Sequence, residues 1–170
     1  MHQKWSPLPA HVVKVHVGAA IRCDETIASL EVVIRDSYNK IIVAAIQQTQ
    51  LDGDVKYVAV EAIKWGFQAA RNTEFQSKVV EIDCQNVASL VNNKQGSKSE
   101  ILWIISKIQS NNKDFQHVKC QCISRLCNAY ALSLAKLTLR HNSLVVWLDS
   151  LPAKIKYFYW CELMKGLLSL

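Results

Sequence analysis

A short apolar run that ends in an acid constrains the fold of this chain more than any other feature. Val79, Val80 and Ile82 predict a buried β-strand, and Asp83 follows directly at its carboxyl end. Open α/β sheets place their ligand chemistry at the carboxyl ends of strands. A second acid, Glu61, lies in the segment VAVEAIKWGFQAA, whose apolar spacing is helical. The sequence therefore predicts an α/β fold with a functional site at this edge of the sheet.

The first fifty residues predict three strands. Over residues 11–17 valines alternate with polar residues, which is the period of a strand with one face in the core. Further strands are expected at about 27–34 and 41–46, joined by RDSYNK, whose Asp, Ser and Asn favour a turn. These three strands are expected to form an antiparallel meander.

The remaining elements alternate between helices and strands. A largely buried helix is predicted over 57–71, and a short helix over 87–91 follows the Asp83 strand. Ser97 and Glu100 form a capping box that predicts the start of a third helix. A last strand and a last helix are expected at 115–123 and 128–140, which gives the order βββαβααβα.

Length and composition fit a single domain. With 170 residues and 50% apolar content the chain can bury one ordinary core. The expected organisation is an N-terminal arm at 1–10, a domain at 11–150 and an apolar tail at 151–170. No apolar run reaches membrane-spanning length, so no membrane association is expected. The N-terminus lacks a secretory pattern, and the six cysteines are expected to be thiols of an intracellular protein, nuclear or cytoplasmic.

The charge balance is basic. Twenty Lys and Arg against fourteen Asp and Glu give a net charge of +6 and a pI near 9.0. This balance suits a polyanionic partner such as nucleic acid, but the basic residues are scattered, so a solvated positive surface is an equal alternative.

Several strings, in order along the chain, resemble the ribonuclease H type 1 domain, in particular its plant retroelement-derived version. The resemblance covers residues 5–149 through WSPLPAHVVKVHV, VIRDSYNKII, VEAIKWGFQAA, VEIDCQNVASLVN, NAYALSLAKL and NSLVVW. It implies a ribonuclease H-like fold: a five-stranded mixed sheet, three strands antiparallel and then two parallel, flanked by helices. It also implies an enzyme that cleaves the RNA strand of an RNA–DNA hybrid with two divalent ions, Mg²⁺ or Mn²⁺.

The family holds its ions with four carboxylates, and only two have counterparts here. The resemblance assigns the helix acid to Glu61 and the strand-end acid to Asp83, as remnant catalytic and metal-binding residues. The other two positions fall on Gly18 and Leu132, and a histidine common in the family falls on Cys122. Two carboxylates cannot balance two divalent ions, so we expect one weakly bound ion at most and no two-metal cleavage.

Two polar residues are candidates for contact with a nucleic-acid strand. Gln85 matches a family Gln that contacts the nucleic acid next to the cut site, although it could simply begin a helix. Asn128 matches the Asn near the start of the family's last helix, where it could line the groove or cap the helix. The spacing of Cys120, Cys122 and Cys127 favours core or edge thiols over a zinc site. The histidines show no metal-binding pattern and are expected at the surface or as caps.

Three functions are compatible with these features. The first is a degenerate ribonuclease H-like domain that binds an RNA–DNA hybrid or duplex. The second is a slow hybrid ribonuclease that uses one metal or a carboxylate from elsewhere, such as Asp24 or Glu25. The third is a protein-interaction module in which residues 155–170 contact a partner or form a homodimer.

Overall fold

The computed structural model describes most of the strands and two complete helices. The described residues are 8–21, 26–50, 55–73, 75, 77–92, 103, 106–108, 110, 117–123, 133–134, 144–151, 153 and 155.

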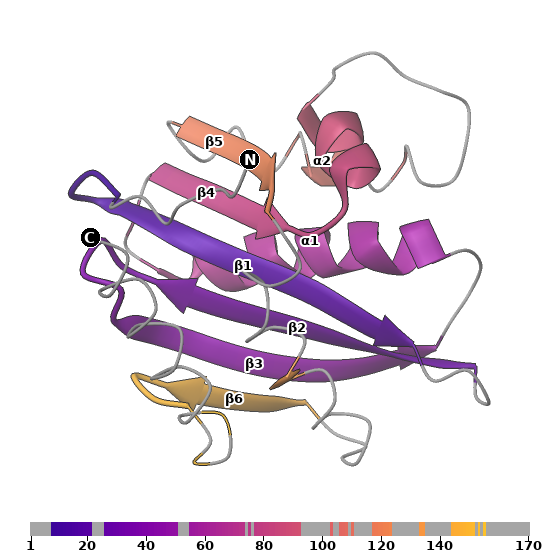
Figure 1. The fold of residues 1–170 in the computed structure, drawn as a ribbon, viewed down its shortest axis with the longest axis horizontal. Coiled ribbons are helices and arrows are strands. Elements are labelled where there is room, and N and C mark those ends of the chain that lie inside the picture. The colour runs from indigo at the N-terminus through magenta and orange to yellow at the C-terminus, as the bar shows by residue number, and fades with distance from the viewer. Residues whose placement is uncertain are drawn as a thin grey trace.

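A mixed sheet forms the centre of the molecule (Figure 1). Its order is β5-β4-β1-β2-β3-β6. The first three strands are antiparallel neighbours, β4 is parallel to β1, β5 is parallel to β4, and β6 is antiparallel to β3. The strands are β1 (Val12–Ile21), β2 (Ile27–Arg35), β3 (Ile41–Gln50), β4 (Ser77–Ile82), β5 (His117–Cys122) and β6 (Val145–Leu148).

The predicted meander and the two parallel strands are confirmed, but the sheet has six strands where five were expected. The additional strand, β6, has only four residues and pairs with Val43–Ile46 of β3. Val146 and Leu148 are exposed, so β6 has neither the length nor the burial that marks the inner strands. Its pairing with β3, which no local pattern encodes, defines it as a strand.

The turn between β2 and β3 follows its sequence. The carboxylate Oδ1 of Asp36 accepts hydrogen bonds from the backbone N–H groups of Tyr38 and Lys40, at 2.9 and 2.8 Å. Asn39 has a positive φ of 64°, a conformation that asparagine tolerates better than most residues. The RDSYNK segment therefore closes the hairpin through its own side chains.

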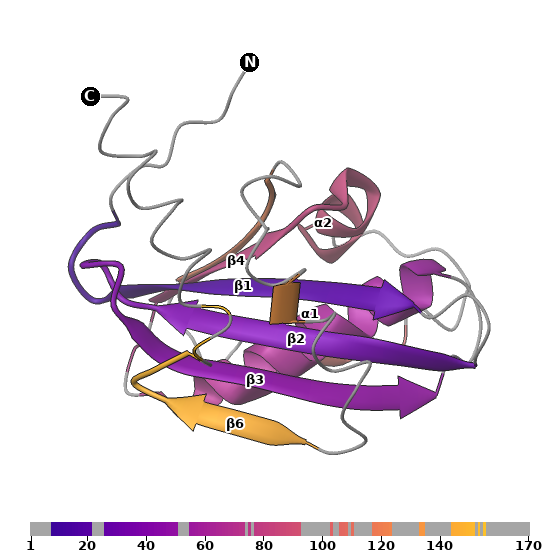
Figure 2. The same ribbon diagram turned by 60° about the horizontal axis from the view of Figure 1, so that its bottom comes forward.

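Helix α1 (Val55–Arg71) covers one face of the sheet and lies behind the strands in Figures 1 and 2. Gly66 allows this close approach, because a Cβ atom there would collide with the Val17 side chain. Helix α2 (Gln85–Asn92) follows β4 and packs beside β5. Apolar side chains of the sheet and both helices form the main core, including Val13, Val15, Val17, Val32, Ile34, Ile63, Phe67, Val80, Ile82 and Val87.

The opposite face of the sheet carries a second, smaller apolar cluster. It contains Val33, Ile41, Ala44, Ile46, Leu134, Leu151 and Ile155. Residues 103, 106–108, 110 and 133–134 are helical, which agrees with the two later helices, whose ends lie outside the described residues. Within the described residues, no helix has the length and apolar character needed to cross a membrane.

Candidate functional site

Glu61 lies on the sheet-facing helix α1 and is held by a neighbouring lysine. Its Oε2 lies 2.5 Å from Nζ of Lys64, three residues further along the helix, and both side chains are about four-fifths buried. Glu61 also lines an open depression of about 400 Å³ together with Thr49, Gln50, Tyr57 and Val58. The predicted helix acid therefore faces the junction between the end of β3 and the start of α1, with its charge balanced locally.

Asp83 is half-buried and follows β4 directly, as predicted. The parallel register pairs His16 of β1 with Glu81 of β4. Two residues further along both strands, the same register brings Gly18 into line with Asp83. The strand-end acid therefore lies beside the β1 position at which the expected first carboxylate is absent.

Gly18 has an acid as its partner on its other side. In the β1–β2 ladder Gly18 pairs with Glu31, so both residues belong to the same face of the sheet. The Glu31 side chain is completely buried, and neither carboxylate oxygen has a hydrogen-bond partner within the described part of the chain. Burial, and then the negative charge of Asp83, raise the pKa of Glu31 well above its ordinary value.

Sequence reasoning missed Glu31. A glutamate that alternates with Ser29 and Val33 in the run IASLEVVIR is compatible with a solvent-facing strand position. One signal in the sequence was available: Glu31 is surrounded by Leu30, Val32 and Val33, so both faces of this strand carry apolar residues. An acid in such a run can be buried.

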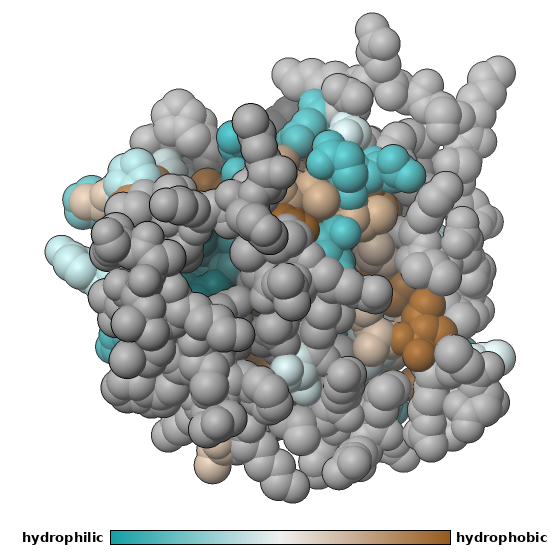
Figure 3. All heavy atoms as spheres, in the orientation of Figure 1, coloured by the Kyte–Doolittle hydropathy of each residue, from teal (hydrophilic) through white to brown (hydrophobic). Residues whose placement is uncertain are grey.

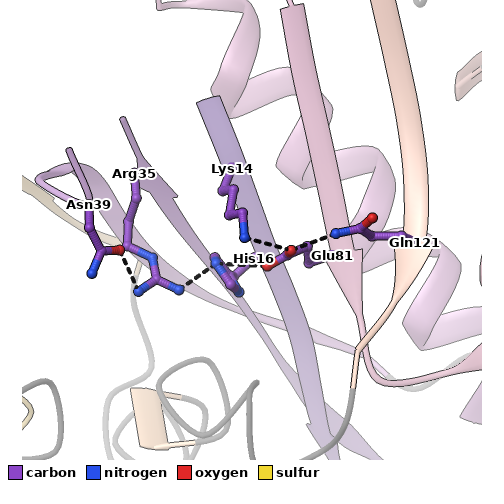
Figure 4. Close-up of polar contacts among 6 residues, drawn as sticks. All are labelled: Lys14, His16, Arg35, Asn39, Glu81 and Gln121. Carbon is purple, nitrogen blue, oxygen red and sulfur yellow. Dashed lines mark hydrogen bonds and ion pairs between the residues drawn. The ribbon is translucent and has the colours of Figure 1, made fainter. Parts of the chain in front are cut away.

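A buried chain of polar contacts extends over the same face of the sheet (Figure 4). Glu81 is its centre: Oε1 accepts from Nζ of Lys14 at 3.2 Å and from Nε2 of Gln121 at 2.7 Å, and Oε2 lies 3.0 Å from Nε2 of His16. Arg35 continues the chain, with Nη2 2.5 Å from Nε2 of His16 and Nη1 donating to Asn39 Oδ1 at 2.9 Å.

The histidine in this chain is neutral. Burial, then the charges of Arg35 and Lys14, lower the pKa of His16 well below its ordinary value. The prediction that His16 lies at the surface or acts as a cap is wrong, since it is 3% exposed. The polar side of β1 is buried as completely as its apolar side.

Comparisons with known proteins agree with this architecture. The family model described as reverse transcriptase-like matches residues 16–138, most of the chain. The chain belongs to the reverse transcriptase-like family. Its resemblance to the ribonuclease H-like superfamily is thereby confirmed. No functionally curated protein matches the chain.

Solved structures show which fold this reverse transcriptase-like chain adopts. Ribonuclease H1 from the halophilic archaeon Halobacterium salinarum superposes with a TM-score of 0.69 at 15% identity, covering 76% of this chain and 98% of that one. The N-terminal ribonuclease H domain of a Mycobacterium tuberculosis protein gives 0.68 at 15% identity, covering 77% and 95%. LC11 ribonuclease H1, solved with an RNA/DNA hybrid, gives 0.63 at 14% identity, covering 75% and 99%. The fold is that of ribonuclease H1.

The remaining predicted site residues of the reverse transcriptase-like chain divide into described and undescribed positions. Gln85 begins α2, is exposed, and its Nε2 donates to Ser89 Oγ at 3.2 Å. Hydrophilic side chains gather in this region of the surface (Figure 3). Leu132 and Asn128, the other expected positions, lie outside the described residues.

The thiols near the site are free. Cys122 ends β5, and burial, then the proximity of Cys84 and Asp83, raise its pKa. Cys120 belongs to the main core, where burial raises its pKa to about 12, so it remains a protonated thiol at neutral pH. Cys127 lies outside the described residues. Among the residues that the structure describes, no group of three or more His, Cys, Asp or Glu side chains could hold a metal ion.

Proposed function

We propose that this domain binds nucleic acid, an RNA–DNA hybrid or a duplex, and does not carry out two-metal cleavage of the RNA strand. One observation carries the second half of the proposal: glycine stands at position 18, the β1 position where the resemblance requires a carboxylate. A cleaving site needs enough anionic ligands for two cations on the attacking and leaving oxygens. The loss of the acid expected at Leu132 acts in the same direction.

The remnant acids Glu61 and Asp83 define the location of this site. The site holds at most one Mg²⁺ or Mn²⁺ ion, with Asp83 as a ligand, because Glu61 is already paired with Lys64. Gln85, exposed directly after Asp83, is the described side chain best suited to contact a bound strand. Asn128 is proposed for the same groove.

The basic charge balance of the sequence supports the binding half of the proposal. A net charge of +6 favours a polyanion, and a ribonuclease H1 of the same fold was solved with an RNA/DNA hybrid. We propose residues 11–150 as the binding domain, with residues 1–10 as an arm and residues 151–170 as an apolar tail. The plant retroelement origin is likewise a proposal, based on sequence resemblance.

A gel-shift and cleavage experiment tests both halves. Purified protein is expected to shift a labelled RNA–DNA hybrid at low salt and to lose affinity as salt rises, because phosphate contacts release counterions. No cleavage is expected with Mg²⁺ or Mn²⁺. Robust cleavage that disappears in Asp83→Asn would establish the slow nuclease instead. The absence of any shift, with a dimer by light scattering, would favour the interaction module.

A further inference from the structure

Three positions form a row across the middle of the sheet. Glu31 of β2 is the direct ladder partner of Gly18 on β1. The parallel register of β1 and β4 pairs His16 with Glu81, and its extension by two residues brings Asp83 into line with Gly18 from the other side. Residues opposed on neighbouring strands project from the same face, with Cβ positions about 5 Å apart. Glu31 and Asp83 therefore flank Gly18 from the strands on either side of β1, and Gly18 has no side chain to fill the space between them. The row therefore runs acid, glycine, acid.

Glu31 and Asp83 interact electrostatically. The charge of Asp83 is one of the two causes that raise the pKa of Glu31, and burial is the larger. Glu61 lies on α1 instead, where its carboxylate forms an ion pair with Lys64. Across β1, the acid in register with Asp83 is therefore Glu31 of β2.

The carboxylate of Glu31 is suited to bind a cation. It is fully buried, and both oxygens lack hydrogen-bond partners among the described residues. The cations of the same face are engaged elsewhere in the buried chain: Lys14 with Glu81, and Arg35 with His16 and Asn39. A buried carboxylate without partners is costly, and a hard divalent cation coordinated by oxygen would offset that cost.

We propose that Glu31 replaces, from the neighbouring strand, the carboxylate that β1 lacks at Gly18, and that Glu31 and Asp83 together bind one Mg²⁺ or Mn²⁺ ion. Water, and in the complex a phosphate oxygen, complete the coordination. The phosphate contact rests on the proposed nucleic-acid binding, whereas the metal site itself does not. Two carboxylates balance one divalent ion and leave no ligands for a second.

Titration calorimetry with Mn²⁺ alone, without nucleic acid, tests the site. The wild-type protein is expected to bind one ion, and Glu31→Gln and Asp83→Asn are each expected to weaken binding roughly tenfold or more. Asp149→Asn, which removes an exposed acid at the far edge of the sheet, is the matched control and should bind as wild type. Wild-type affinity in Glu31→Gln would overturn the proposal. So would a tenfold loss in Glu61→Gln together with none in Glu31→Gln.

Thermal unfolding of the same variants guards against a folding artefact. In EDTA, Glu31→Gln is expected to melt at a higher temperature than wild type, because a buried carboxylate has become a neutral amide. Mn²⁺ should raise the Tm of wild type by more than it raises that of Glu31→Gln. Equal Mn²⁺ stabilisation of both proteins would contradict the assignment.

Moving the acid from β2 back to β1 gives a positive test. Glu31→Gly alone should abolish Mn²⁺ binding, and the double variant Gly18→Asp with Glu31→Gly should restore it by returning the acid to β1. A folded double variant that binds no Mn²⁺ would count against the row of three positions as the site. Mn²⁺ binding without any hybrid shift would remove the proposed function and keep this inference, whereas a shift in EDTA without Mn²⁺ binding would do the reverse.

Discussion

The two faces of strand β1 are both buried, but by different physical means. Toward α1, strand β1 presents Val13, Val15 and Val17 to an apolar core. Toward the other face it presents Lys14 and His16, which are buried in a chain of ion pairs and hydrogen bonds. Apolar burial is non-directional and depends mainly on filled volume, whereas buried polar groups depend on each individual partner. The stability contributed by the α1 face should therefore depend mainly on filled volume, and that contributed by the polar face on each ion pair and hydrogen bond.

The largest expected effect is on the α1 face. Phe67→Ala should lower the free energy of unfolding by about 3–5 kcal/mol, because Phe67 is 1% exposed and its removal leaves a cavity. Urea denaturation measures this loss. The neighbouring exposed residue provides a control, since Gln68→Ala should change stability by no more than about 0.5 kcal/mol. Similar losses in both variants would contradict the assignment of this helix face.

On the polar face, the loss of one partner should cost more than the loss of two. Glu81→Met should destabilise the protein by about 3 kcal/mol, because it leaves buried Lys14 without its carboxylate contact. The double variant Lys14→Met with Glu81→Met should recover part of that loss, since neither member of this ion pair is then buried without the other. A double-mutant cycle in urea checks this coupling. Strict additivity of the two substitutions would show that the ion pair is energetically unimportant.

Acid should weaken the polar face through His16. Its pKa is lowered in the folded state, so as pH falls the unfolded chain takes up the proton first, near its ordinary value of 6.5. The stability due to neutral His16 is present above that pH and is lost below it, by at most about 1.4 kcal/mol per pH unit. Relative to His16→Gln, wild type should lose unfolding free energy between pH 7.5 and pH 5. A difference that does not vary with pH would refute the buried neutral histidine.

The smallest change in the free energy of unfolding is expected for an exposed ion pair. Lys40 Nζ and Asp149 Oδ1 lie 3.3 Å apart, but both side chains are about two-thirds exposed. Asp149→Asn should change the free energy of unfolding by less than about 1 kcal/mol, because solvent and salt screen such pairs. A loss comparable to that of Glu81→Met would show that exposure does not separate the two ion pairs.

The sequence predicted the α1 face well because periodicity encodes it. The alternating valines of β1 and the helical spacing around Phe67 each identify the side that must be buried. Strand β6 was missed because four half-exposed residues carry no such period, and only pairing with β3 defines them. Strands β1 and β3 extend beyond their apolar runs for the same reason. Backbone pairing with β2 continues through Gly18–Ile21 of β1 and through Gln47–Gln50 of β3.

The polar face was predicted less well because alternation identifies a second face without indicating whether anything covers it. His16 and Glu31 occupy positions that a half-exposed strand would give to polar residues, yet both are buried. The strand-end position indicated Asp83, and family resemblance assigned Glu61 and Asp83 to inherited acid positions. Such a resemblance cannot identify an acid on another strand. Glu31 required the register of the β1–β2 ladder.

The number of Mn²⁺ ions bound in the presence of an RNA–DNA hybrid tests the central claim most directly. Mn²⁺ titration of the protein with a short RNA–DNA hybrid, followed by analysis of the RNA strand, gives both quantities in one sample. The account predicts one ion per chain and intact RNA. Two ions per chain with cleaved RNA would contradict it.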